Sequence, residues 1–211
     1  MKRKIFVGLI FSFVLSSCAW GAINEKTVEA AWKRIATADG FEVVKINYEK
    51  DTSPNAWVKF QSQKNFSVHV TQGLMKILDS EEQIAGVLGH EIGHVRLGHY
   101  NKGVGRNVGW ALLSAGLGRV GGTAGKVAQL AGNVGMNLAE SGFSRGQEVE
   151  ADDYGTELLK RAGYDPYGLY RAMKAFADNK YVTQPNGFNS HPPTARRLKH
   201  LMDKAKAVKG E

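Results

Sequence analysis

The sequence predicts an α+β fold that is mainly helical, with a small three-stranded sheet in its N-terminal half. Three short candidate strands come first, at residues 41–48, 56–60 and 66–70. After Thr71 the apolar residues recur at helical spacing almost to the end of the chain. The chain has 211 residues, of which 43% are hydrophobic and 23% charged, so it is long enough for one buried core and is not disordered as a whole.

The N-terminus has the layout of an export signal. Residues 2–4 are basic and residues 5–15 carry no charge. Small residues follow, and the run from Leu15 to Cys18 resembles a bacterial lipobox, in which the cysteine is acylated. We therefore expect residues 1–17 to be a lipoprotein signal peptide, Cys18 to be the lipidation site, and residues 18–24 to be a tether.

Two other interpretations of this leader stay open. Ordinary cleavage after Gly21 would remove Cys18 with the leader. An uncleaved anchor could use the uncharged residues 5–24, although their apolar part is short for a span of about 20 residues. Ala19 is not the aspartate that retains lipoproteins at the inner membrane, so the lipobox implies a lipid anchor in the outer membrane, facing the periplasm.

The positive net charge is not accompanied by the other features of a nucleic-acid-binding protein. The formal charge is +8, and it falls to +5 (25 basic against 20 acidic residues) without residues 1–17. Much of the excess lies in residues 196–211, but no aromatic platform or phosphate-binding glycine loop accompanies it. We interpret this segment as a solvated helix face. The single cysteine excludes an internal disulfide and a cysteine-rich zinc finger.

Helical elements are expected along the rest of the chain, with residues 25–211 forming a single domain. The first spans residues 25–38, where apolar residues fall at i, i+3, i+4 and i+7. Ser80 and Ser144 are each followed three residues later by a glutamine, which predicts capping boxes at the starts of two further helices. The glycine- and alanine-rich residues 102–138 contain no uncharged run long enough to span a bilayer. They could cover the core or contact a membrane surface.

The run His90-Glu91-Ile92-Gly93-His94 is an HExxH pattern on the first of these capped helices. Residues i and i+4 lie on one helix face, so both imidazoles can reach one Zn²⁺ ion. Glu91 lies beside that face, where its carboxylate can take a proton from water on the metal. Glycines 86, 89 and 93 thin the helix surface, which indicates close approach by a neighbouring helix or a substrate.

A third ligand is needed, and Glu148 is the best candidate. One zincin class would require a Gly at position 97 and a His at 100, where this chain has Leu97 and Tyr100. His99 faces away from the metal if the helix continues. Glu148 and Asp152 share a face of the second capped helix, so Glu148 can bind the metal while Asp152 accepts a hydrogen bond from a ligand imidazole. Glu150 is the runner-up, but it points nearly opposite.

These motifs resemble metallopeptidase family forty-eight, and within it the small LoiP-type lipoproteins. The resemblance rests on residues 90–94, the Ser-Arg-x-x-Glu-x-x-Ala-Asp run at 144–152, and the run from Ser190 to Arg196. It implies a gluzincin-type zincin domain with one Zn²⁺ per chain. It also places His191 near the metal, as a donor to the reacting carbonyl or as a fourth ligand of the resting enzyme. Arg196 is then the arginine that faces the site.

The function expected from these residues is that of a zinc endopeptidase. Glu91 acts as general base, and the expected substrates are unfolded or extended proteins, including those of the cell envelope. A substrate strand could add to the sheet along residues 66–70. Two alternatives stay open: a zinc-bearing chaperone or binding module with little proteolysis, and a cell-wall amidase. The sequence does not indicate the natural substrate or the oligomeric state.

Overall fold

The computed structural model describes residues 22–62, 65–100, 143–179 and 191–211, which form six helices and three strands with a short helix among them. In chain order these are α1 (Glu25–Asp39), β1 (Ile46–Glu49), β2 (Ala56–Ser62), β3 (Asn65–Thr71), α2 (Gln72–Ile77), α3 (Glu81–Arg96), α6 (Arg145–Arg161), α7 (Gly168–Asp178) and α8 (Ala195–Lys209). The export signal, Cys18 and the glycine-rich residues 102–138 lie outside the described residues.

The three strands form one sheet in the order β1-β3-β2. β1 is parallel to β3, with Ile46 opposite Val68, and β2 is antiparallel to β3, with Val58 opposite the same Val68. β3 is therefore bonded on both sides from Val68 to Val70, and the expectation that a substrate could add along residues 66–70 is wrong, because most of that run is already paired with β1 and β2. The first strand also begins at Ile46 rather than at residue 41.

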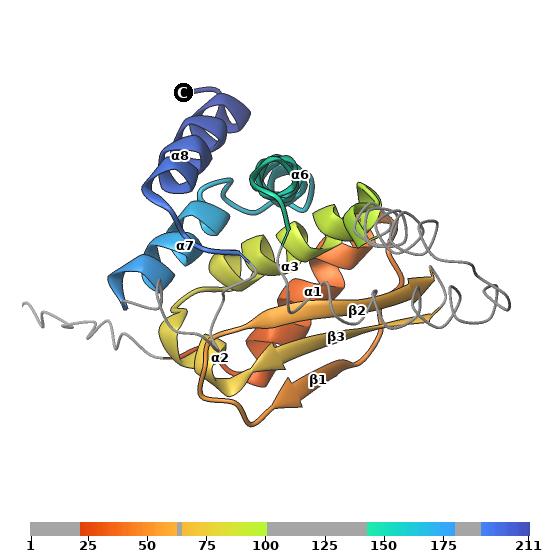
Figure 1. Ribbon diagram of the computed structural model, residues 1–211. Helices are drawn as coiled ribbons and strands as arrows, with labels where there is room; N and C mark the ends of the chain where they lie inside the picture. Colours follow the sequence, from red (N-terminus) through yellow and green to blue (C-terminus); the bar gives the residue numbers. More distant parts are fainter. Residues whose placement is uncertain (1–21, 63–64, 101–142, 180–190) are drawn as a thin grey trace, which may run out of the picture.

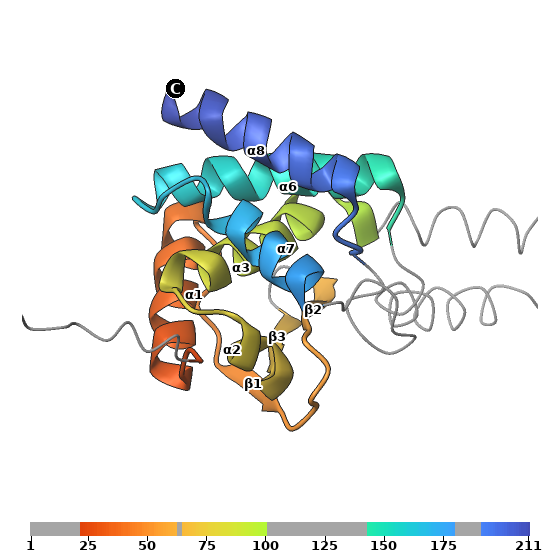
Figure 2. The same cartoon turned by 90° about the vertical axis from the view of Figure 1, so that its left-hand side faces the viewer.

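α3 is the central helix of the fold. Figures 1 and 2 show it between the sheet on one side and α6 and α8 on the other. Every residue from Gln83 to Val95 is buried. A helix whose whole circumference is covered needs partners on all sides, and α3 has them in α1, α6, α7 and β2. The side chains of the HExxH motif are thus held inside the protein.

Both predicted helix starts are present. Ser144 forms a full capping box: its hydroxyl accepts from the Gln147 amide at 3.3 Å, and the Gln147 side chain accepts from the Ser144 amide at 3.0 Å. At α3 the Ser80 hydroxyl caps Gln83 at 3.4 Å, but the Gln83 side chain accepts from the Asp79 amide instead. Among the described residues, no helix has the length and apolar character needed to cross a bilayer.

Candidate metal centre

Four buried side chains from separate parts of the chain meet beside α3. His90 and His94 come from α3, Glu148 from the first turn of α6, and His191 from the segment before α8; one ligand atom of each lies within 4.8 Å of the others. The two Nε2 atoms of His90 and His94 are 3.0 Å apart, and Nε2 of His94 is 3.4 Å from Oε1 of Glu148. Nδ1 of His191 is 2.8 Å from the same carboxylate oxygen.

Glycines let α3 and α6 approach closely enough for this meeting. A Cβ at Gly93 would lie 3.1 Å from the Ala151 carbonyl oxygen, and one at Gly89 would lie 3.4 Å from that of Gly155. A Cβ at Gly155 would lie 2.8 Å from the His90 backbone nitrogen. The expectation that the α3 glycines mark a close neighbour is confirmed: for Gly89 and Gly93 that neighbour is the helix carrying Glu148, and for Gly86 it is Leu169 of α7.

We expect Gly155→Ala to weaken the metal centre and the fold together. The added methyl meets rigid backbone, and such overpacking costs about 1–3 kcal/mol, more than the roughly 1 kcal/mol that Ala gains over Gly in a helix. Gly146→Ala on the same helix is the matched control, because nothing lies within 4 Å of its new Cβ. Urea unfolding should show a loss for Gly155→Ala alone; equal stability of the two variants would contradict the packing argument.

A second layer of charged groups surrounds the cluster. Nδ1 of His90 lies 3.0 Å from Oδ1 of Asp152, which is fully buried. Arg197 binds Asp152 with two nitrogens, at 2.9 and 2.6 Å, and places a third 2.7 Å from Oε2 of Glu148. Burial would raise the pKa of Asp152, but the Arg197 guanidinium outweighs it and holds that pKa below its usual value. Asp152 is therefore ionised and can accept the proton of His90 Nδ1.

The sequence interpretation named the wrong arginine. Arg196 is exposed, whereas Arg197 is buried and makes the contacts to Asp152 and Glu148. Thr194 caps α8 by accepting from the Arg197 amide. With the helix start set there, one residue turns the side chain by about 100°, which directs Arg197 inward and Arg196 outward.

His99 is a site neighbour that sequence reasoning missed. It is fully buried, and its Nδ1 lies 2.8 Å from Nδ1 of His94. Its Nε2 lies 3.0 Å from Oε2 of Glu150, the runner-up ligand, which is directed at His99. The available signal was Gly98, a residue type that commonly ends a helix. α3 does end at Arg96, so His99 does not continue along the helix face.

Glu91 lies next to the cluster without belonging to it. Its side chain is 1% exposed, and Oε1 lies 3.6 Å from Nε2 of His191. Neither carboxylate oxygen meets the geometry of a hydrogen bond to another described residue. Burial raises the pKa of this carboxyl, and the histidines around it oppose the rise. A buried carboxylate whose oxygens accept no hydrogen bond of good geometry is an unsatisfied acceptor, and a water molecule at the metal position could donate to it.

The charges inside the cluster favour metal-binding forms. Burial lowers the pKa of His94 well below its usual value, so its imidazole is neutral, as a ligand must be. Burial opposes ionisation of Glu148, but His191 and the two α3 histidines outweigh it and lower the pKa of that carboxyl. Two imidazoles and a carboxylate, with a third imidazole close by, are a donor set that suits Zn²⁺.

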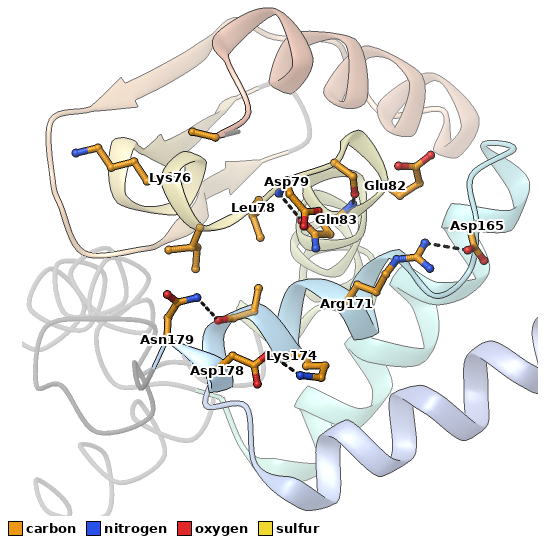
Figure 3. A pocket seen from close by; sticks show the side chains of 14 residues that line it. Lys76, Leu78, Asp79, Glu82, Gln83, Asp165, Arg171, Lys174, Asp178 and Asn179 are labelled. Atoms are coloured by element: carbon orange, nitrogen blue, oxygen red, sulfur yellow. Dashed lines mark hydrogen bonds and ion pairs between the residues drawn. The ribbon is translucent and has the colours of Figure 1, made fainter. Parts of the chain in front are cut away.

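A separate hollow lies between α7 and the segment joining α2 to α3 (Figure 3). Its volume is about 780 Å³. Two of its acids are already paired with cations of α7: Asp165 with Arg171 at 2.8 Å, and Asp178 with Lys174 at 2.5 Å. None of the described site residues lines it. We therefore assign the chemistry to the His90 cluster.

Comparison with known proteins agrees with this geometry. The family model described as "Peptidase family M48" matches residues 22–205 of this chain. The chain is 36% identical to metalloprotease LoiP of Escherichia coli K12 over 144 residues, covering 68% of this chain and 57% of that protein. It is 33% identical to metalloprotease YcaL of the same organism over 165 residues (75% and 62%) and 30% identical to the beta-barrel assembly-enhancing protease of Yersinia pestis over 158 residues (68% and 31%). The chain thus spans less than two thirds of the length of these relatives.

Proposed function

We propose, from the premise that this chain belongs to peptidase family M48, that it is a zinc-dependent endopeptidase acting on unfolded or extended proteins. The observation that carries the proposal is the meeting of His90, His94 and Glu148 in one buried cluster, with the buried Glu91 carboxylate beside it. His90, His94 and Glu148 would hold one Zn²⁺. Zn²⁺ bound there supplies a Lewis acid, which polarises a carbonyl and lowers the pKa of water from 15.7 to about 7.

The residues around the cluster would transfer the protons of the reaction and hold the ligands in position. Glu91 takes a proton from the attacking water and later delivers it to the leaving amine, since its carboxylate is buried, free of hydrogen bonds to described residues and one position from a ligand. Asp152 holds the His90 ring by its Nδ1. Arg197 keeps Asp152 ionised and lies 2.7 Å from Oε2 of Glu148.

His191 is close enough for either of the roles considered for it. Its Nδ1 is 2.8 Å from Glu148 and 3.2 Å from His90 Nε2, which suits a fourth ligand of the resting enzyme. The Glu148 and Glu91 carboxylates overcome the effect of burial and raise its pKa, which suits a cationic donor to the carbonyl oxygen.

His191→Ala should separate these two roles, measured as kcat on unfolded casein with zinc-loaded protein. A rise in kcat indicates that His191 is a fourth ligand of the resting enzyme, which the substitution removes. A fall of about 10²–10³-fold indicates a donor to the transition state. An unchanged kcat would contradict both roles.

We place the substrate backbone along β2. Among the described residues this strand is bonded only to β3, on one side, and it packs against α3, which carries His90 and Glu91. An extended peptide added to its other edge would satisfy its backbone groups with little demand on sequence, as expected for a protease of unfolded chains. For this reason we propose β2 as the binding edge, in place of the β3 residues expected from the sequence.

We also propose that the chain works in the cell envelope, as a single domain over residues 25–211 held by a lipid on Cys18. The support is the basic and apolar layout of residues 1–17 with the only cysteine at the lipobox position. Two acyl chains or more would anchor it firmly, because each buried CH₂ contributes about 0.8 kcal/mol. Its orientation would be toward the periplasm, where unfolded envelope proteins are the available substrates.

Metal removal tests the proposed reaction against both alternatives. We expect zinc-loaded protein to cleave unfolded casein, to lose this activity after chelation, and to regain it when Zn²⁺ is restored. Peptidoglycan should stay intact. Release of peptidoglycan fragments without casein cleavage would favour the cell-wall amidase. Suppression of casein aggregation with no cleavage under any metal condition would favour the chaperone and contradict the peptidase.

A further inference from the structure

The chain reverses direction directly after the zinc-binding motif. α3 ends at Arg96, and Gly98 adopts the left-handed region at φ 67°. A residue with a Cβ is strained in that region, whereas glycine is not. The reversal returns His99 to the side of α3 from which His94 projects, where it is fully buried. It is placed there by backbone geometry that the HExxH pattern does not contain.

The contacts of His99 with Glu150 and His94 suit one arrangement of protons. Glu150 is a carboxylate and can only accept, so His99 Nε2, at 3.0 Å, carries the hydrogen. In the neutral form of His99 this leaves a lone pair on Nδ1, which lies 2.8 Å from Nδ1 of His94 and can accept its hydrogen. The remaining nitrogen of His94, Nε2, is left with its lone pair directed at Glu148 and His90 Nε2.

We propose that His99, held by Glu150, is a positioning residue that fixes the tautomer and the ring orientation of His94 for the metal. The inference rests on the proposed function, since it assumes that His94 binds Zn²⁺ through Nε2. It gives the two α3 histidines different supports: His90 is held directly by the buried Asp152, whereas His94 is held through a second imidazole. This second support includes the Glu150 carboxylate, whose side chain is 55% exposed.

Packing around the pair agrees with a positioning role. The ring of Phe143 stacks on His94 with centroids 3.8 Å apart and planes 18° apart, so the imidazole is held in its plane. Gln147 of α6 places its side-chain nitrogen 3.5 Å from the carbonyl oxygen of His99. The His99 turn is thereby tied to the same helix that carries Glu148. Rotation of the His94 ring would break contacts on both of its sides.

Zinc affinity, measured by competition with a chromophoric chelator, tests the proposal without relying on activity. We expect His99→Phe, which keeps a ring but has no acceptor, to weaken zinc binding by about 10–100-fold. His99→Asn places an acceptor oxygen near the position of Nδ1 and should restore most of the affinity. Glu150→Ala should weaken binding less than His99→Phe, because water can accept from Nε2 at this half-exposed position.

The controls separate positioning from structure and from the proposed activity. Glu157→Ala removes a similarly exposed carboxylate two turns along α6 and should leave affinity unchanged. The thermal midpoint of zinc-free protein should be similar for His99→Phe and His99→Asn. Wild-type affinity in His99→Phe, or equal losses in the Phe and Asn variants, would overturn the proposal. If wild type binds zinc but cleaves nothing, the endopeptidase fails while the affinity comparison still decides the role of His99.

Discussion

Glu91→Gln is expected to reduce kcat on unfolded casein by at least about 10²–10⁴-fold while zinc content stays at the wild-type value. The amide has nearly the same shape as the carboxylate but cannot accept the proton of the attacking water. Metal content should not change, because the carboxylate lies outside the cluster of ligand atoms. Loss of a buried carboxylate whose pKa burial raises also removes a desolvation cost, so the variant should fold at least as stably as wild type.

The measurement for this prediction combines kcat with zinc content by atomic absorption on the same sample. Glu82→Gln is a matched control, since it makes the same chemical change in the first turn of the same helix. It should leave both quantities unchanged. Persistent cleavage in Glu91→Gln with zinc in place would show that another group takes the proton. Loss of zinc would show instead that Glu91 is a ligand.

The parts of the site that sequence could predict are those set by spacing within one helix. Two histidines at i and i+4 share a face in any helix, and so do Glu148 and Asp152. Ser80 and Ser144 independently indicated where the two helices begin. The family resemblance predicts that the faces of these two helices pack together. Glycines 89 and 93 are the physical indication of that close packing. The structure brings these four residues, His90, His94, Glu148 and Asp152, together beside α3.

The parts that could not be predicted depend on where an element stops or on its neighbours in space. His99 faces away from the metal only if the helix continues through Gly98, where in fact it has ended. Arg196 and Arg197 are adjacent, so the choice between them depends on the exact residue at which α8 begins. β3 was expected to offer a substrate edge because nothing in its sequence tells a central strand from an outer one. In each case the residue pattern predicts the type of element, but not where the element ends or which elements lie beside it.

Arg197→Met is expected to lower the free energy of unfolding of the metal-free protein by about 3–5 kcal/mol. Arg197 is the counter-charge of two buried carboxylates, Asp152 and Glu148, and methionine retains only the apolar stem. Without it, burial should raise the pKa of Asp152, reversing the present shift. At neutral pH the variant must either bury an uncompensated charge or take up a proton, and both outcomes cost stability.

Arg196→Met is the control, and as a change at an exposed position it should stay within about 0.5 kcal/mol of wild type in urea. Arg197→Lys should recover little, since an ammonium cannot reproduce the two bonds to Asp152 together with the third to Glu148. The stabilisation by ionised Asp152 is present above the pKa that this group has in the unfolded chain and is lost as pH falls through its lower folded value. Wild-type stability should therefore approach that of Arg197→Met in acid, and a constant difference across pH would contradict the assigned pairing.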